Sequence, residues 1–244
     1  MLDGPRNGRR KTSGLFGRPL KASVHHRLVL SFALTVLGSI TAAAVEPQAT
    51  EYASATRASR GDRSQIVAAL GSKLAGLATS DGRPLCQVDD IAGGLWTPSV
   101  LANGRMFFPL ARETQVREPV GGATRLVWSS PVFEGVMGPV VELNGLLVGH
   151  HKRRLTALDA ATGEQLWQLP DETDGQLMVF GKWLLFVNDR AGRLELLAVD
   201  RRGAEVRRRQ AVIKPARMET PLTFARDTLY IRAPEELVAL RLGD

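Results

Sequence analysis

Short apolar segments bounded by turn-forming residues recur at a constant interval along the second half of the chain. The segment 155–159 (LTALD) is followed by 196–200 (LLAVD) and 237–241 (LVALR), each 41 residues after the one before. A second series in phase with the first begins at Pro98, Pro139 and Pro221. Short apolar runs between turn residues are typical of strands, and two series with one period indicate an internal repeat.

A turn pair and a second apolar segment follow each start of the second series. The turn pairs are Asn103-Gly104, Asn144-Gly145 and Arg226-Asp227. Asn-Gly between apolar segments predicts a two-residue hairpin turn, because both residues tolerate a positive φ. The intermediate repeat carries Gly181-Lys182 about four residues early, and a longer turn at 188–192 restores the phase.

Each repeat therefore predicts four antiparallel strands in about 41 residues, which is the size of one propeller blade. The sequence predicts an all-β fold made of β-propeller blades, with four to five repeats in a small or partial ring. A weaker early copy at 74–88 superposes on 155–169 at an offset of 81. A short helix is the competing interpretation there, since apolar residues also fall at helical spacing, namely Ile66, Leu70, Leu74 and Leu77.

The N-terminal 45 residues differ from the rest in charge and in hydropathy. Residues 1–27 hold seven Lys or Arg and one acid, and residues 28–45 form an uncharged apolar stretch that ends near Ala44. This order is typical of a secretory signal cleaved after Ala44, or of an uncleaved anchor with its basic end inside. We expect a leader with signal peptide or signal anchor at 1–45, a polar linker at 46–64 and the repeats at 65–244.

The leader accounts for nearly all of the formal net charge of +7. The repeats are therefore almost neutral, and nucleic-acid binding loses its main electrostatic support. Cys86 is the single cysteine, so the chain has no intrachain disulfide and no CxxC pair.

The most distinctive motif, ALDAATGEQLW at 157–167, can be interpreted from its residue types. Its characteristic positions are Ala157, Asp159, Thr162, Gly163 and Trp167. Asp159 and Thr162 can accept hydrogen bonds from nearby backbone amides, and Gly163 supplies a positive φ at the turn. Trp167 offers the largest apolar face for packing on a neighbouring blade.

This motif resembles the tryptophan-docking repeat of the PQQ-like, quinoprotein-type β-propeller superfamily, over residues 97–242 and more weakly over 65–88. The superfamily contains quinoprotein dehydrogenases and non-enzymatic scaffolds of outer-membrane assembly. An enzyme of this family implies about eight blades, a vicinal disulfide and an acidic Ca²⁺ site. The single cysteine and the repeat number favour the scaffold branch, with no cofactor.

Other polar groups are weaker candidates for a site. Acidic pairs at 89–90 and 171–172 are typical of solvated turns, and His150-His151 adjoins basic residues that disfavour a bound cation. We therefore predict no catalytic and no metal site. One basic cluster remains as a candidate partner patch: Arg201, Arg202, Arg207, Arg208 and Arg209.

These observations predict an extracytoplasmic scaffold, periplasmic or secreted, that binds proteins or peptides without catalysis. It would contact the membrane through residues 28–45 if these are not cleaved. Two alternatives stay open: a diverged or partial PQQ-dependent dehydrogenase-like protein, and a degenerate propeller fragment. An unfinished ring would expose strand edges. Closure by an N-terminal strand such as 84–88 is the expected solution, with homo-oligomerisation as an alternative.

Overall fold

The computed structural model consists of five antiparallel sheets of four strands each. It describes residues 20–23, 56–60, 63–70, 73–88, 99–101, 103–110, 112–120, 123–134, 138–218 and 220–242. The strands in chain order are β1 (Leu20–Ser23), β2 (Thr56–Arg60), β3 (Arg63–Leu70), β4 (Lys73–Ala78), β5 (Pro84–Val88), β6 (Ser99–Val100), β7 (Met106–Pro109), β8 (Thr114–Val120), β9 (Ala123–Ser130), β10 (Val141–Leu143), β11 (Leu146–His151), β12 (Arg154–Asp159), β13 (Gln165–Glu172), β14 (Gly175–Phe180), β15 (Trp183–Asn188), β16 (Arg193–Asp200), β17 (Gly203–Ala211), β18 (Thr223–Ala225), β19 (Thr228–Arg232) and β20 (Glu236–Arg241).

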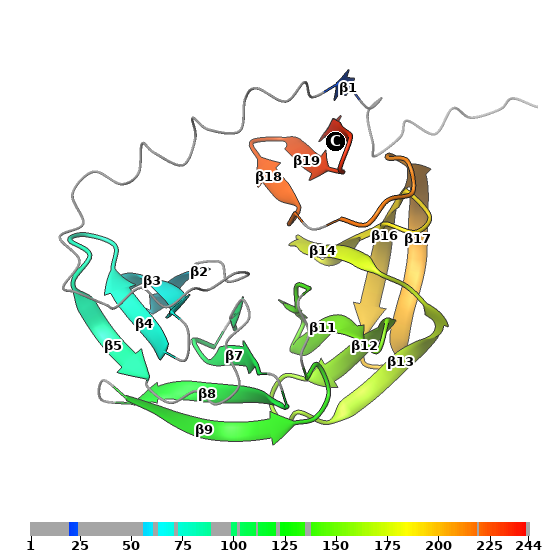
Figure 1. The fold of residues 1–244 in the computed structure, drawn as a ribbon. Coiled ribbons are helices and arrows are strands. Elements are labelled where there is room, and N and C mark those ends of the chain that lie inside the picture. Colours follow the sequence, from blue (N-terminus) through cyan, green and yellow to red (C-terminus); the bar gives the residue numbers. More distant parts are fainter. Residues whose placement is uncertain are drawn as a thin grey trace, which may run out of the picture.

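The five sheets follow one another around a common centre in chain order, with β5, β9, β13 and β17 at the periphery (Figure 1). We call them blade 1 (β2–β5), blade 2 (β6–β9), blade 3 (β10–β13), blade 4 (β14–β17) and blade 5 (β18–β20 with β1). No described residue is helical. The arrangement confirms the predicted all-β fold of four-stranded propeller blades.

Tight turns form where the sequence predicts them. Asn144 and Gly145 have φ of 54° and 75° between β10 and β11, and Gly104 has φ of 78° between β6 and β7. In blade 5, Arg226 adopts φ of 59° between β18 and β19. Positive φ at the turn matches the right-handed twist of the flanking strands, so these residues fix the hairpin register.

The core lies between blades, and blade 4 is buried on both faces. In blade 4, Leu184 pairs with Leu197, and both lie in the apolar cluster shared with blade 3. The adjacent pair, Leu185 and Leu196, belongs to the cluster shared with blade 5. Successive residues of a strand point to opposite faces, so a continuous apolar run serves two interfaces. Each fully buried leucine contributes about 1.5–3 kcal/mol relative to exposure.

The N-terminal part differs from the sequence-based expectation in three respects. Residues 63–70 and 73–78 form β3 and β4, so the strand interpretation of the early copy is correct and the helical one is wrong. Strand β2 begins at Thr56, inside the predicted linker 46–64, and pairs with β3 because both contribute to one sheet. Strand β5 (Pro84–Val88) pairs with β4 inside blade 1, so it does not close the ring onto blade 5.

Blade 5 is instead completed by β1, which lies inside the predicted leader 1–45 and pairs with β20. The apolar stretch 28–45 lies outside the described residues. Among the residues that the structure describes, none belongs to a helix with the length and apolarity needed to cross a lipid bilayer.

Candidate functional site

The turn between β12 and β13 is built around the carboxylate of Asp159. Its Oδ1 accepts hydrogen bonds from the backbone N–H groups of Ala161 (2.8 Å) and Thr162 (3.2 Å). Its backbone carbonyl accepts a hydrogen bond from the N–H of Gly163 at 2.8 Å, and Thr162 Oγ1 accepts one from the N–H of Glu164 at 3.3 Å. Asp159 is 9% exposed, so its carboxylate, which has little access to water, is satisfied by the backbone N–H groups of the turn.

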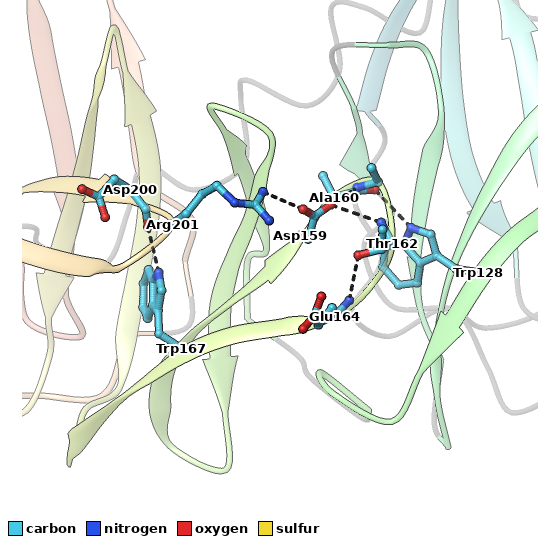
Figure 2. A network of polar contacts seen from close by, with 9 residues as sticks. Trp128, Asp159, Ala160, Thr162, Glu164, Trp167, Asp200 and Arg201 are labelled. Carbon is cyan, nitrogen blue, oxygen red and sulfur yellow. Dashed lines mark hydrogen bonds and ion pairs between the residues drawn. The ribbon is translucent and has the colours of Figure 1, made fainter.

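Gly163 occupies the position where blade 2 meets blade 3. Its φ of 77° is in the left-handed region that favours glycine. A Cβ added there would lie 2.6 Å from the indole ring of Trp128, which belongs to β9 of blade 2. The Trp128 Nε1–H donates a hydrogen bond to the carbonyl of Ala160 at 3.1 Å. One turn of blade 3 is thus the docking surface for the tryptophan of blade 2 (Figure 2).

Trp167 makes the equivalent contact one blade further along. It lies on β13, opposite Ala157, and its Nε1–H donates to the carbonyl of Asp200 in blade 4 at 2.8 Å. Arg201 of blade 4 reaches back, and its Nη1 lies 2.6 Å from Asp159 Oδ2. Figure 2 shows Trp167 and Arg201 crossing between the two blades on either side of this junction.

The protonation of Asp159 reflects two opposing effects. Burial acts to raise its pKa, but hydrogen bonds from Arg201 and from the N–H groups of Ala161 and Thr162 outweigh it, so the pKa is lowered. The carboxylate is therefore ionised at neutral pH. The predicted motif residues lie at two inter-blade junctions: Gly163 contacts Trp128 of blade 2, whereas Ala157 and Trp167 lie in the cluster shared with blade 4. Asp159 pairs with Arg201 of blade 4, and Thr162 accepts a hydrogen bond within the turn.

The arginine cluster lies on blade 4, at the β16–β17 turn and along the peripheral strand β17. Three of its five members form ion pairs within the chain: Arg201 with Asp159, Arg207 with Glu205 at 2.7 Å, and Arg209 with the buried Glu195 at 3.2 Å. Arg202 and Arg208 have no ion pair among the described residues. The cluster therefore carries less free positive charge than its sequence indicates, and it is centred on Arg202 and Arg208.

The two adjacent histidines at the end of β11 are both buried and face different neighbours. The ring of His150 lies 5.3 Å from that of Phe186 in blade 4, and its Nε2 has no hydrogen-bond partner in the described part of the chain. His151 Nδ1 accepts a hydrogen bond from the N–H of Phe133 at 3.1 Å. Burial lowers the pKa of His150 to about 4, the charge of Asp174 acting weakly against it, so the ring is neutral at pH 7.

Acidic side chains do not converge in the described residues. Asp171 is exposed and Asp174 half-buried, whereas Asp89 and Asp90 lie outside the described part. Within the described ranges, no three His, Cys, Asp or Glu side chains come close enough to bind a metal ion. One carboxylate that sequence reasoning did not single out is Asp189, 4% exposed, whose Oδ2 accepts a hydrogen bond from the N–H of Met218 at 3.3 Å. Burial raises its pKa despite that bond.

A family model described as "Outer membrane protein assembly factor BamB" matches residues 71–242 of the chain, which is well over half of it. The chain belongs to the BamB family. This membership confirms the resemblance inferred from the tryptophan-docking motif, because the matched region contains that motif.

A solved structure supports the same fold. The crystal structure of BamB from Moraxella catarrhalis is similar to this chain with a TM-score of 0.56 and 16% sequence identity. The similarity covers 78% of this chain and 58% of that chain, so this BamB-family chain spans less than two thirds of the length of that relative. At this identity the likeness shows the fold alone. No curated protein matches the chain.

Proposed function

We propose that this BamB-family chain is an extracytoplasmic propeller scaffold that binds proteins or peptides during outer-membrane protein assembly and performs no chemistry. One observation carries the proposal: the family match at 71–242. It is supported by the use of the motif residues, since Asp159, Trp128 and Trp167 bind other blades. A protein whose motif side chains hold its own blades together is suited to present a rigid surface.

The surface that we propose for partner binding is the periphery of blade 4 around Arg202 and Arg208. Strand β17 is the last strand of its sheet among the described residues, and its residues alternate between exposed and half-buried positions. A positively charged strand edge favours an acidic, extended segment, by charge attraction and by main-chain hydrogen bonding. Residues 1–45 are proposed to direct the chain out of the cytoplasm, either as a cleaved signal or as an anchor.

Genetic complementation tests the assembly role. Loss of the gene should lower the amount of folded outer-membrane β-barrel proteins, measured by heat-modifiable gel migration of outer-membrane fractions. The wild-type chain should restore that amount, whereas the double variant Arg202→Glu and Arg208→Glu should restore it only in part. Arg112→Glu with Arg154→Glu is the matched control, because it reverses two exposed arginines on blades 2 and 3. Unchanged barrel levels after gene loss would contradict the assembly role.

A separate measurement tests the absence of quinoprotein chemistry. Pyrroloquinoline quinone with Ca²⁺ should leave the melting temperature of the purified chain unchanged, because a ligand that binds only the folded state raises it. A concentration-dependent rise would favour the dehydrogenase-like alternative.

A further inference from the structure

The fourth strand of blade 5 has a different origin from the fourth strand of every other blade. In blades 1 to 4 it directly follows the third strand along the chain, as β13 follows β12. In blade 5 the third strand, β20, is paired instead with β1, the first described strand. The pairing is antiparallel and runs from Leu20 opposite Ala239 to Ser23 opposite Glu236. In Figure 1, β1 lies beside the last strand of the chain.

The register of this pairing coincides with the docking register of the other blades. Ala157 is paired with Trp167 in blade 3, and Val116, 41 positions earlier, is paired with Trp128 in blade 2. Ala239 lies two repeats after Ala157 and is paired with Leu20. The strand that completes blade 5 therefore places a large apolar residue where two other blades place a docking tryptophan.

Chain order makes this closure incompatible with export as proposed above. The apolar stretch 28–45 separates β1 from blade 1 in the sequence. If it spans a bilayer as a helix of about 27 Å, β1 and the blades lie on opposite sides of the membrane. If the chain is cut after Ala44, β1 is removed. In both cases the outer edge of β20 loses the strand that covers it.

We propose that the outer edge of β20 is a strand-acceptor site, covered by β1 before export and by an extended segment of another protein afterwards. The inference rests on the proposed export and scaffold role, and it adds a second binding place, at the edge of blade 5. An uncovered edge presents unpaired N–H and C=O groups, which an added antiparallel strand satisfies. The register predicts the partner: an extended segment with a large apolar residue opposite Ala239.

The first experiment asks whether β1 leaves the edge on export. The full chain, with Cys86→Ser, carries Leu20→Cys and Ala239→Cys, and is compared with the same chain retained in the cytoplasm by Leu34→Arg and Leu37→Arg. After mild oxidation, a non-reducing gel should show the intrachain cross-link in the retained chain and none in the exported chain. A cross-link of equal yield in the exported chain would overturn the inference.

The second experiment asks whether the exposed edge takes a strand from another molecule. Under the same mild oxidation, the exported chain with Cys86→Ser and Ala239→Cys is mixed with a peptide of residues 16–27 that carries Leu20→Cys. We expect disulfide formation at least about tenfold faster than with Ala198→Cys, the equivalent position of blade 4, because access controls thiol exchange. Ala198 is already covered by Glu205 of β17. Equal rates at the two positions, or a dimer cross-linked through position 239 that excludes the peptide, would overturn the proposal.

The two proposals fail in distinguishable ways. A chain found only in the cytoplasm, or one whose loss leaves barrel proteins unchanged, contradicts the proposed function. An exported chain that keeps its intrachain cross-link, or that forms no disulfide with the peptide, contradicts only the proposal of a strand-acceptor site.

Discussion

At the scale of single residues, Gly163 satisfies two independent constraints. Its backbone is left-handed, and the ring of Trp128 occupies the space where a Cβ would lie. We predict that Gly163→Ala destabilises the protein by about 2–5 kcal/mol. About 1–2 kcal/mol comes from the positive φ and the rest from displacing the indole. The free energy of unfolding in urea measures the loss.

Gly145→Ala is the matched control for this substitution. Gly145 has nearly the same φ, 75°, in the same blade, and no atom lies within 4 Å of the position a Cβ would take. The unfolding free energy of this variant should fall only by the cost of the positive φ, about 1–2 kcal/mol. Equal losses in the two variants would mean that contact with Trp128 adds nothing.

His150 makes stability depend on pH. Its pKa in the folded chain is about 4, below the ordinary value of 6.5, because burial disfavours the charged ring. The unfolded chain therefore takes up a proton first as the pH falls. The contribution of His150 to the unfolding free energy is fully present above about pH 6.5. It falls by about 3 kcal/mol in all as the pH is lowered to 4, and it changes no further below that pH.

The variant His150→Phe tests this dependence, since phenylalanine keeps the ring contact with Phe186 and cannot bind a proton. Between pH 7.5 and pH 4.5, the wild-type chain should lose about 2–3 kcal/mol more of its unfolding free energy than the variant. His151 is present in both proteins, so its contribution cancels. Parallel pH profiles would show that His150 does not titrate as described.

At the scale of strands, the sequence predicts what is encoded locally. The hairpin of β10 and β11 is evident because Asn144-Gly145 lies between two apolar runs. Strand β1 has no such signal. It is four residues long and lies in a basic segment, and its Leu20 pairs with Ala239, 219 positions later. A short pairing of that sequence separation leaves no periodicity in the sequence, which is why closure was expected from 84–88 instead.

The same distinction applies to the inter-blade junction. The turn around Asp159 could be predicted from its own residues, because the carboxylate bonds to amides two and three positions later. The contact of Trp128 with Gly163 and the ion pair of Arg201 with Asp159 depend on how neighbouring blades stack. Residue type alone does not specify that stacking.

Trp167 shows how one side chain fixes two blades together. It is 9% exposed, packs in the cluster between blades 3 and 4, and donates to the Asp200 carbonyl. We predict a loss of about 3–5 kcal/mol for Trp167→Ala, from lost burial and the cavity left behind. Trp167→Phe keeps much of the apolar contact and lacks the N–H, so it should lose less. Thermal and urea unfolding measure both, and equal losses would assign the whole effect to the hydrogen bond.

At the scale of the whole molecule, the outward face of blade 5 differs from the corresponding face of blade 4. Leu185 pairs with Leu196, and both are buried against blade 5. Leu237, one repeat after Leu196, pairs with the exposed Arg232. Glu235, also exposed, stands one repeat after another buried leucine of blade 4. A polar face of this kind keeps the last described blade from presenting a continuous apolar surface to other molecules.

Replacing Arg232 and Glu235 by leucine should therefore cause molecules of the chain to associate through this face of blade 5. We predict that Arg232→Leu with Glu235→Leu shifts the purified chain towards dimers and larger species in sedimentation velocity, because it extends the apolar surface next to Leu237. Arg193→Leu with Glu164→Leu also removes one positive and one negative exposed charge, but on separate blades, where single apolar residues are tolerated. If both variants sediment as the wild-type chain does, the polar residues of blade 5 do not prevent stacking, and its solubility must come from the strand that covers β20.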